Sequence, residues 1–131
     1  MILIGTKCQV EQVVTEQLTA SAAGSGALPV FGTPFMAAMM ENAAMTALQS
    51  FLEEGKGSVG THLNIVHSSP SPVGMKVWAD AEIVSVSEDG RTVDFEVRAW
   101  DEKGSIGYGT HSRTVVTNDH FLSKCNAKLE G

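Results

Sequence analysis

The second half of the chain alternates between apolar and polar residues with a period of two. This period predicts β-strands, because successive side chains of a strand point to opposite faces. The strands expected there cover residues 59–68, 75–87, 91–100 and 105–117. Polar turns at 88–90 and 101–104 are short enough to join the last three strands as antiparallel neighbours. One further strand, rich in Val, is predicted near the N-terminus over residues 6–15.

Between these strands, residues 34 to about 52 are apolar on nearly every side of a helical projection, which predicts a buried helix. Thr33 is suited to cap this helix, and Pro34 fits the first helical position, where its missing N–H is not needed. Gly55 is the candidate C-cap. Residues 19–32 are mostly small, with Gly and Ser as breakers, and are expected to form a loop.

An apolar helix needs a surface to cover it, and a curved antiparallel sheet of about five strands would supply one. The order of one strand, a buried helix and then a four-strand meander is typical of the hotdog fold, an α+β architecture. We therefore expect a single domain spanning residues 1–131, since the chain shows no repeat and no linker.

Charge and composition limit the kinds of molecule that this protein is expected to bind. The net charge of −6, with nine Lys and Arg spread along the chain, argues against nucleic acid and anionic membranes, although a local basic pocket could still hold an anionic ligand. No segment reads as a signal peptide or approaches the roughly 20 apolar residues of a membrane span. Cys8 and Cys125 have no metal-type spacing and are expected to be free thiols, so a cytoplasmic location is expected.

Glu41 is the first candidate for chemistry, because its neighbours three and four positions away on the helix are all apolar. A carboxylate there lies at an edge or has a buried partner, since burying it alone is very costly. The alternative is that Glu41 lies at a subunit interface and pairs with a backbone donor. His67 is the second candidate, because strand alternation places it on the core-facing side with Leu63 and Ile65.

Thr33 is the third candidate, with helix capping as the alternative role. Eight residues separate it from Glu41, about 12 Å along a helix axis, so the two side chains should not meet within one chain. A site that uses both would need a second subunit to supply one member. On the last strand, Gly107, Gly109, His111 and Arg113 share one face, where glycines permit close approach of a ligand or of another backbone. Arg113 could hold a phosphate, pair with an acid or be solvated.

Several segments in order carry a resemblance to a known family. They are Val30-Phe31-Gly32-Thr33-Pro34-Phe35-Met36, Met40-Glu41-Asn42-Ala43-Ala44, Ser58-Val59-Gly60-Thr61-His62, Val66-His67, Pro72-Val73-Gly74-Met75 and Gly107 to Arg113. Together they resemble the fluoroacetyl-CoA thioesterase-like branch of the hotdog thioesterases, over roughly residues 6–125. The resemblance implies a homodimer with active sites at the interface. The sequence leaves open whether such dimers pair into tetramers.

The resemblance also implies a catalytic set of Thr33, Glu41 and His67, with Gly60 near the thioester carbonyl and Arg113 near the substrate. His111, on the same strand face as Arg113, is a further candidate for substrate binding. One departure stands out: the fluoroacetyl-CoA enzyme carries an aromatic lid segment, whereas residues 20–28 here contain no aromatic residue. This argues against selectivity for a fluorinated acyl group.

The expected activity is hydrolysis of an acyl thioester, with acyl-CoA as the expected substrate and no metal or other cofactor. Glu41 would attack the carbonyl or activate a water, His67 would transfer protons, and Thr33 would orient the nucleophile or donate to the carbonyl oxygen; attack by Thr33 itself remains an alternative. A non-catalytic hotdog module that binds acyl-CoA or another small molecule is the alternative function. A hydratase is a third, although its Asp and His usually lie close together in sequence, unlike Glu41 and His67.

Overall fold

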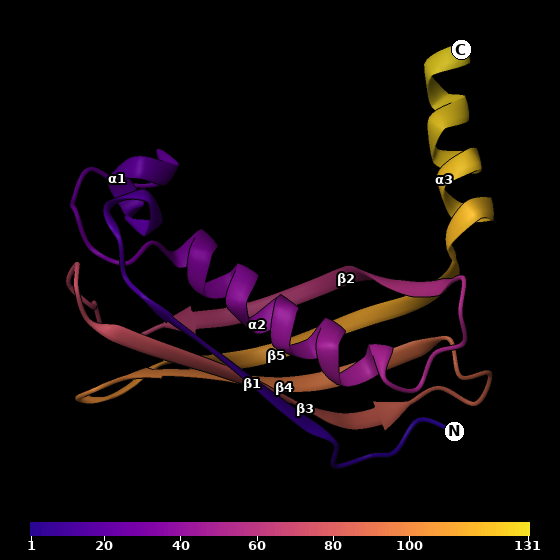
Figure 1. The fold of residues 1–131 in the computed structure, drawn as a ribbon, viewed down its shortest axis with the longest axis horizontal. Coiled ribbons are helices and arrows are strands. Elements are labelled where there is room, and N and C mark those ends of the chain that lie inside the picture. The colour runs from indigo at the N-terminus through magenta and orange to yellow at the C-terminus, as the bar shows by residue number, and fades with distance from the viewer.

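The computed structural model describes all of residues 1–131 and shows one antiparallel sheet with a long helix across one face (Figure 1). The strands are β1 (Lys7–Val13), β2 (Lys56–His67), β3 (Lys76–Val86), β4 (Thr92–Asp101) and β5 (Gly104–Thr117). The helices are α1 (Ala20–Ala23), α2 (Thr33–Gln49) and α3 (Asn118–Asn126), with 3₁₀ turns at Glu16–Leu18 and Ala127–Glu130. The expected α+β architecture of five strands and one long helix is confirmed.

The strand order is β1-β3-β4-β5-β2, with every neighbouring pair antiparallel. The expectation of a four-strand meander is therefore wrong: β3, β4 and β5 follow one another through tight turns, but β2 pairs with β5 at the far edge. Residues 68–75 carry the chain from one side of the sheet to the other, and they are too long and too rich in proline for a hairpin. As a result β1 and β2 are the two edges of the sheet.

Helix α2 packs along the sheet through one side only. Its buried residues are Met36, Met39, Met40, Ala43, Ala44, Ala47 and Leu48. They meet the alternate, inward residues of β3 and β4, which include Ala79, Ala81 and Phe95. Each fully buried Met stabilises the fold by about 1.5–3 kcal/mol. The expectation that the helix is buried on all sides is wrong within one chain, because Ala38, Asn42 and Met45 on its outward side are exposed.

Both expected helix caps differ from those observed. Gly32 is the N-cap of α2 and Thr33 is its first residue, so Thr33 does not cap the helix. The helix ends at Gln49 with Ser50 as C-cap, and Gly55 instead takes a left-handed φ of 87° in the turn before β2. Within the expected loop, the short helix α1 forms, and the hydroxyl of the buried Thr19 accepts a hydrogen bond from the Ala22 N–H at 3.1 Å.

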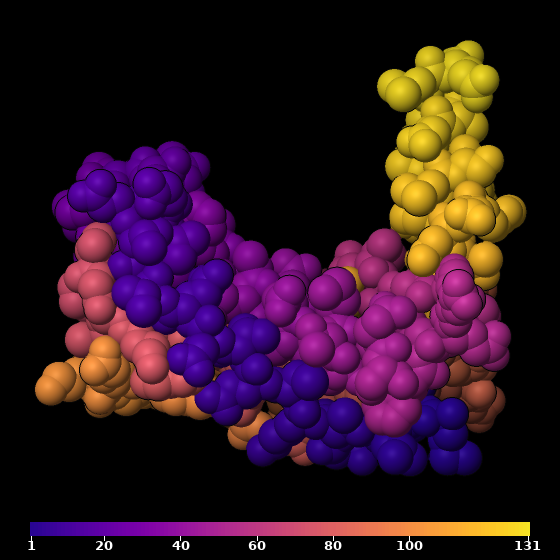
Figure 2. All heavy atoms as spheres, viewed as in Figure 1, coloured from indigo at the N-terminus to yellow at the C-terminus, as the bar shows by residue number.

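Helix α3 was not expected from the sequence and stands away from the rest of the molecule, leaving a hollowed side between itself and the α1 region (Figures 1 and 2). Phe121 and Leu122 on this helix are 39% and 55% exposed. Cys8 on β1 and Cys125 on α3 are both free. No helix in the structure is long and apolar enough to cross a membrane.

Candidate functional site

Thr33 and His67 form a direct side-chain pair. Thr33 opens α2 and His67 closes β2, and the Thr33 Oγ1 lies 2.7 Å from the His67 Nδ1. The pair lies in a pocket of about 320 Å³ whose wall includes Phe31 and the segment Ser68-Ser69-Pro70. The ring of Phe31 meets the imidazole edge to face, with centroids 6.3 Å apart. Because Thr33 does not cap the helix, its hydroxyl is free to make this contact.

Burial lowers the pKa of His67 below its ordinary value, and the backbone of Ser69 opposes this shift in part. The imidazole is therefore neutral at pH 7, with Nδ1 directed at the hydroxyl of Thr33. Its other nitrogen, Nε2, is buried and makes no hydrogen bond within the chain. A neutral imidazole at 2.7 Å from a hydroxyl can exchange a proton with it, and the unpaired Nε2 is available to a further group.

Glu41 belongs to a second cluster, one that also includes Gly60, His111 and Arg113. A Cβ placed on Gly60 would lie 2.7 Å from the Glu41 Oε2, 3.1 Å from the His111 Cε1 and 3.4 Å from the Arg113 Nη1. The glycine therefore lets β2 approach α2 closely enough to set the Glu41 carboxylate against the strand. Glu41 is half-buried and makes no hydrogen bond within the chain.

Arg113 and His111 are only 6% and 1% exposed, and they form a fixed network behind Glu41. The Arg113 guanidinium donates to the Ser58 Oγ at 2.8 Å and to the Ser58 carbonyl at 3.0 Å. Its Nη1 lies 3.2 Å from the His111 Nε2, and the His111 Nδ1 lies 2.7 Å from the His62 carbonyl. A guanidinium can only donate a hydrogen bond and a carbonyl can only accept one. His111 therefore accepts at Nε2 and donates from Nδ1.

Burial is the largest cause that lowers the pKa of His111, and the positive charge of Arg113 adds to it. Burial likewise lowers the pKa of Arg113, while the negative charge of Glu41 opposes that shift. A neutral His111 and a cationic Arg113 thus present one positive charge to the Glu41 side of the cluster. The sequence left three roles open for Arg113: binding a phosphate, pairing with an acid or being solvated. The solvated role is excluded, because Arg113 is buried.

The two clusters remain apart within one chain, as the spacing on the helix predicts. Glu41 lies about 12 Å along α2 from Thr33, and no hydrogen bond joins the two groups. Ser58, which anchors Arg113, was not among the site residues predicted from the sequence. The sequence signal for Ser58 is that strand alternation places it on the same face as Gly60, whereas the pairing of Gly60 with Arg113 across β2 and β5 is visible only in the structure. No group of three or more His, Cys, Asp or Glu side chains is placed to hold a metal ion.

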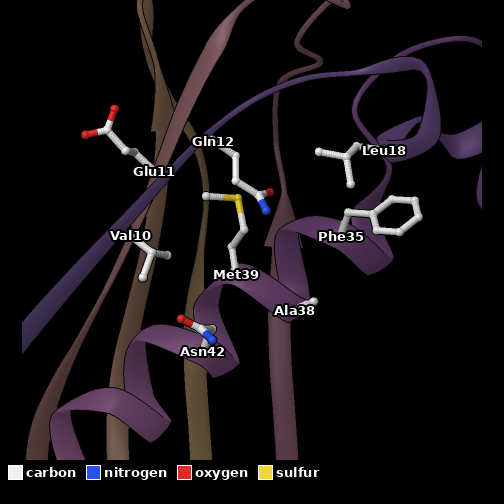
Figure 3. Close-up of a pocket in the computed structure, with 8 residues that line it drawn as sticks. All are labelled: Val10, Glu11, Gln12, Leu18, Phe35, Ala38, Met39 and Asn42. Atoms are coloured by element: carbon white, nitrogen blue, oxygen red, sulfur yellow. The ribbon is translucent and has the colours of Figure 1, made fainter.

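A hollow of about 470 Å³ lies between β1 and the other side of α2 (Figure 3). The side chains of Gln12 and Met39 point toward one another across it, whereas Glu11 points away. Neither Thr33 nor Glu41 nor His67 lines this hollow. It is therefore separate from both clusters.

The family model for fluoroacetyl-CoA-specific thioesterases matches residues 14–119. A fluoroacetyl-CoA thioesterase of Streptantibioticus cattleyicolor is 41% identical over 100 residues, which cover 76% of this chain and 68% of that protein. A solved fluoroacetyl-CoA-specific thioesterase variant superimposes with a TM-score of 0.90 at 33% identity, covering 98% of both chains. A Thermus thermophilus member of the thioesterase superfamily gives a TM-score of 0.90 at 27% identity, covering 99% of this chain and 95% of that one. The resemblance seen in the sequence is confirmed, and the chain belongs to the fluoroacetyl-CoA-specific thioesterase family.

Proposed function

We propose that this protein hydrolyses acyl-CoA thioesters at a site built from Thr33, His67 and Glu41. The observation that carries the proposal is the 2.7 Å contact between the Thr33 hydroxyl and a neutral His67, with the other imidazole nitrogen buried and unpaired. A hydroxyl and imidazole that are held together supply proton transfer, and the half-buried carboxylate of Glu41 supplies the base or nucleophile. Membership of a thioesterase family supports the same chemistry.

In the proposed reaction, water adds to the thioester carbonyl carbon while Glu41 takes its proton. Backbone N–H groups near Gly60 and the Thr33 hydroxyl stabilise the negative charge on the carbonyl oxygen. The carbon–sulfur bond then breaks: the unprotonated Nε2 of the neutral His67 receives the water proton from Glu41 and delivers it to the sulfur, which leaves as a thiol, so that both residues return to their starting forms. Direct attack by Glu41 or by Thr33 would instead leave an acyl group on the protein, which mass spectrometry of a quenched reaction would detect.

The site as proposed requires a second copy of the chain, because the two clusters do not meet within one. The strand β2 is an edge with no partner on its outer side, and Leu63 and Val66 on it are 36% and 45% exposed. Antiparallel pairing of β2 with its copy would bury these residues and satisfy the free edge. A register that sets Gly60 opposite the partner's His67 would bring Glu41 to the Thr33–His67 pair of the other subunit.

His111 and Arg113 are proposed to act from behind Glu41 and Gly60, since their nitrogens already bond to protein atoms. They would hold the carboxylate and its charge in place rather than contact the acyl group. Gly60 would lie beside the thioester carbonyl. We also propose that selectivity for fluorinated acyl groups is absent, because residues 20–28, which include α1, contain no aromatic side chain. Fluoroacetyl-CoA and acetyl-CoA should then give kcat/KM values within about tenfold of each other.

The direct test is thiol release from a panel of short and medium acyl-CoAs, comparing the wild type with Glu41→Gln. The substitution keeps the size of the side chain and removes its charge, and kcat should fall by about a hundredfold or more. Glu53→Gln, at an exposed acid after the same helix, is the matched control and should keep wild-type turnover. If the wild type binds CoA esters but releases no thiol from any of them, the protein is a binding module and the proposal fails.

Mixing two inactive variants tests whether subunits share a site. A dimer of Glu41→Gln with His67→Asn contains one site with both defects and one with neither, provided that each site takes Glu41 from one chain and His67 from the other. Activity should therefore return when the two variants are unfolded together and refolded. If every site lay within one chain, the mixed dimer would stay inactive. Light scattering of the wild type would distinguish a dimer from a tetramer, the choice that the sequence left open.

The two free thiols favour a reducing compartment, so we propose a cytoplasmic location. Cys8 is partly buried on β1 and Cys125 is exposed on α3, at the two ends of the chain. Fractionation of the producing cells, followed by detection of the protein, would test the location.

A further inference from the structure

A basic pocket of about 320 Å³ lies at the end of the molecule where β2 begins, β5 ends and α3 stands up. Its basic wall residues are Lys56, Arg91, His120 and Lys124, and no acidic residue lines it. The chain as a whole is acidic, with 15 Asp and Glu against nine Lys and Arg. One third of all Lys and Arg side chains therefore surround a single hollow, which neither Thr33, Glu41 nor His67 lines.

These cations are not used to hold the fold together. The ion pairs of the structure involve Lys7, Lys76 and Arg98 only, all of them elsewhere. Lys56, Arg91 and Lys124 are exposed and have no carboxylate partner. The acid closest in sequence to Arg91, Asp89, already accepts hydrogen bonds from the Ser87 hydroxyl and the Arg91 N–H in its own turn. Like charges around one hollow repel one another unless an anion sits between them.

An aromatic side chain completes the wall. Phe121 lines the pocket beside His120, and its ring is 39% exposed. An exposed aromatic face next to several cations suits a nucleotide, since the base can stack on the ring while the phosphates meet the basic groups. A simple inorganic anion would make no use of the ring.

The pocket lies within reach of the Glu41 cluster. Lys56 precedes Gly60 by four residues on β2, which is about 13 Å along an extended strand. In acyl-CoA, the pantetheine arm separates the thioester from the nucleotide phosphates by a long flexible chain. In the proposed dimer, Lys56 would also lie next to the loop after the partner's His67, which lines the Thr33–His67 pocket. One substrate could thus span both pockets.

From these observations we propose that the basic pocket binds the 3′-phosphoadenosine diphosphate end of the CoA thioester, with Phe121 against the adenine. This inference rests on the proposed function, because it places the nucleotide end of the acyl-CoA that the proposed function takes as its substrate. The pocket selects thioesters of CoA over those of pantetheine alone, which carry the same acyl group and sulfur but lack the nucleotide. It acts on binding and leaves the chemical step unchanged.

The test compares the triple variant Lys56→Gln, Arg91→Gln, Lys124→Gln with a matched variant, Lys7→Gln, Lys76→Gln, Arg98→Gln, which removes the same charge elsewhere. The first should raise KM for an acyl-CoA at least about tenfold, leave kcat within about twofold, and leave hydrolysis of the acyl-pantetheine thioester unchanged. The matched variant should leave the KM for acyl-CoA unchanged. Equal KM changes in the two variants, or an equal effect on the pantetheine thioester, would overturn the inference while the hydrolase activity stands.

Calorimetry with adenosine 3′,5′-bisphosphate keeps the test independent of turnover. The wild type should bind this nucleotide, the pocket variant should lose most of the affinity, and Phe121→Leu should weaken binding without any change of charge. If the wild type does not bind the nucleotide, the pocket is no CoA site, whatever the outcome for hydrolysis. If it binds the nucleotide but hydrolyses no thioester, the proposed function fails and the pocket assignment survives.

Discussion

Gly60→Ala tests the placement of the Glu41 carboxylate with a single methyl group. The new Cβ would lie 2.7 Å from the Glu41 Oε2, whereas ordinary contacts begin near 3.4 Å, so the carboxylate must move by about 0.7 Å. The other two neighbours, His111 and Arg113, are buried and hydrogen-bonded, and Glu41 is the group free to yield. A misplacement of this size reduces an enzymatic rate by about ten- to a hundredfold. We expect kcat for an acyl-CoA to fall by that factor.

Stability should change little in Gly60→Ala, because this glycine has no left-handed φ and the displaced atom ends a flexible side chain. Gly57→Ala is the matched control: its Cβ would lie 2.6 Å from the exposed Asn118 Oδ1, an equally severe contact on the same strand. The control should keep kcat within about twofold. Steady-state thiol release and thermal unfolding of both variants are the assays. A folded Gly60→Ala protein with wild-type kcat would show that the Glu41 carboxylate does not need this position.

Three other predictions concern Gly109, Thr33 and His111. Gly109→Ala would press a methyl group against the Asn64 carbonyl, a backbone atom that cannot move aside, so we expect thermal unfolding to show a loss of about 1–3 kcal/mol or more. Thr33→Val should lower kcat by about a hundredfold because it leaves His67 without its hydroxyl, whereas Thr33→Ser should retain most of the activity. Burial holds the pKa of His111 below 6.5, so the unfolded chain binds this proton more tightly; the unfolding free energy should fall as pH drops from 6.5 through the folded pKa, and less steeply in His111→Gln.

The parts of the fold that depend on local patterns could be predicted from the sequence. The apolar run from Met36 to Leu48 fixes α2, and the alternation in β3, β4 and β5 fixes three antiparallel neighbours. The position of β2 could not be predicted this way, because both of its faces are largely exposed and its paired residues on β5 lie at least 40 residues away in sequence. Helix α3 was missed because its residues have no apolar side that the rest of the chain covers.

For the candidate site too, the residues could be predicted from the sequence but their contacts could not. Thr33, Glu41 and His67 stand out in sequence because each is polar where its neighbours predict a helix start or a core face. Their contacts do not follow from the sequence. Thr33 was expected to cap α2, but Gly32 is the N-cap instead. The burial of Arg113 follows from the pairing of Gly60 with Arg113, which only the three-dimensional register of β2 and β5 determines.

The separation of the two clusters constrains any model of how this protein works. An α-helix is too stiff to bring residues eight positions apart together, so no side-chain rotation within one chain joins Glu41 to the Thr33–His67 pair. The same chain leaves the edge strand β2 and the outward side of α2 uncovered, and a second copy would cover both in the proposed dimer. In the proposed mechanism, these three residues can therefore act together only when two chains assemble. Activity per chain should fall on dilution at the concentration where the dimer dissociates, and activity that stays constant through dissociation would require a site within one chain.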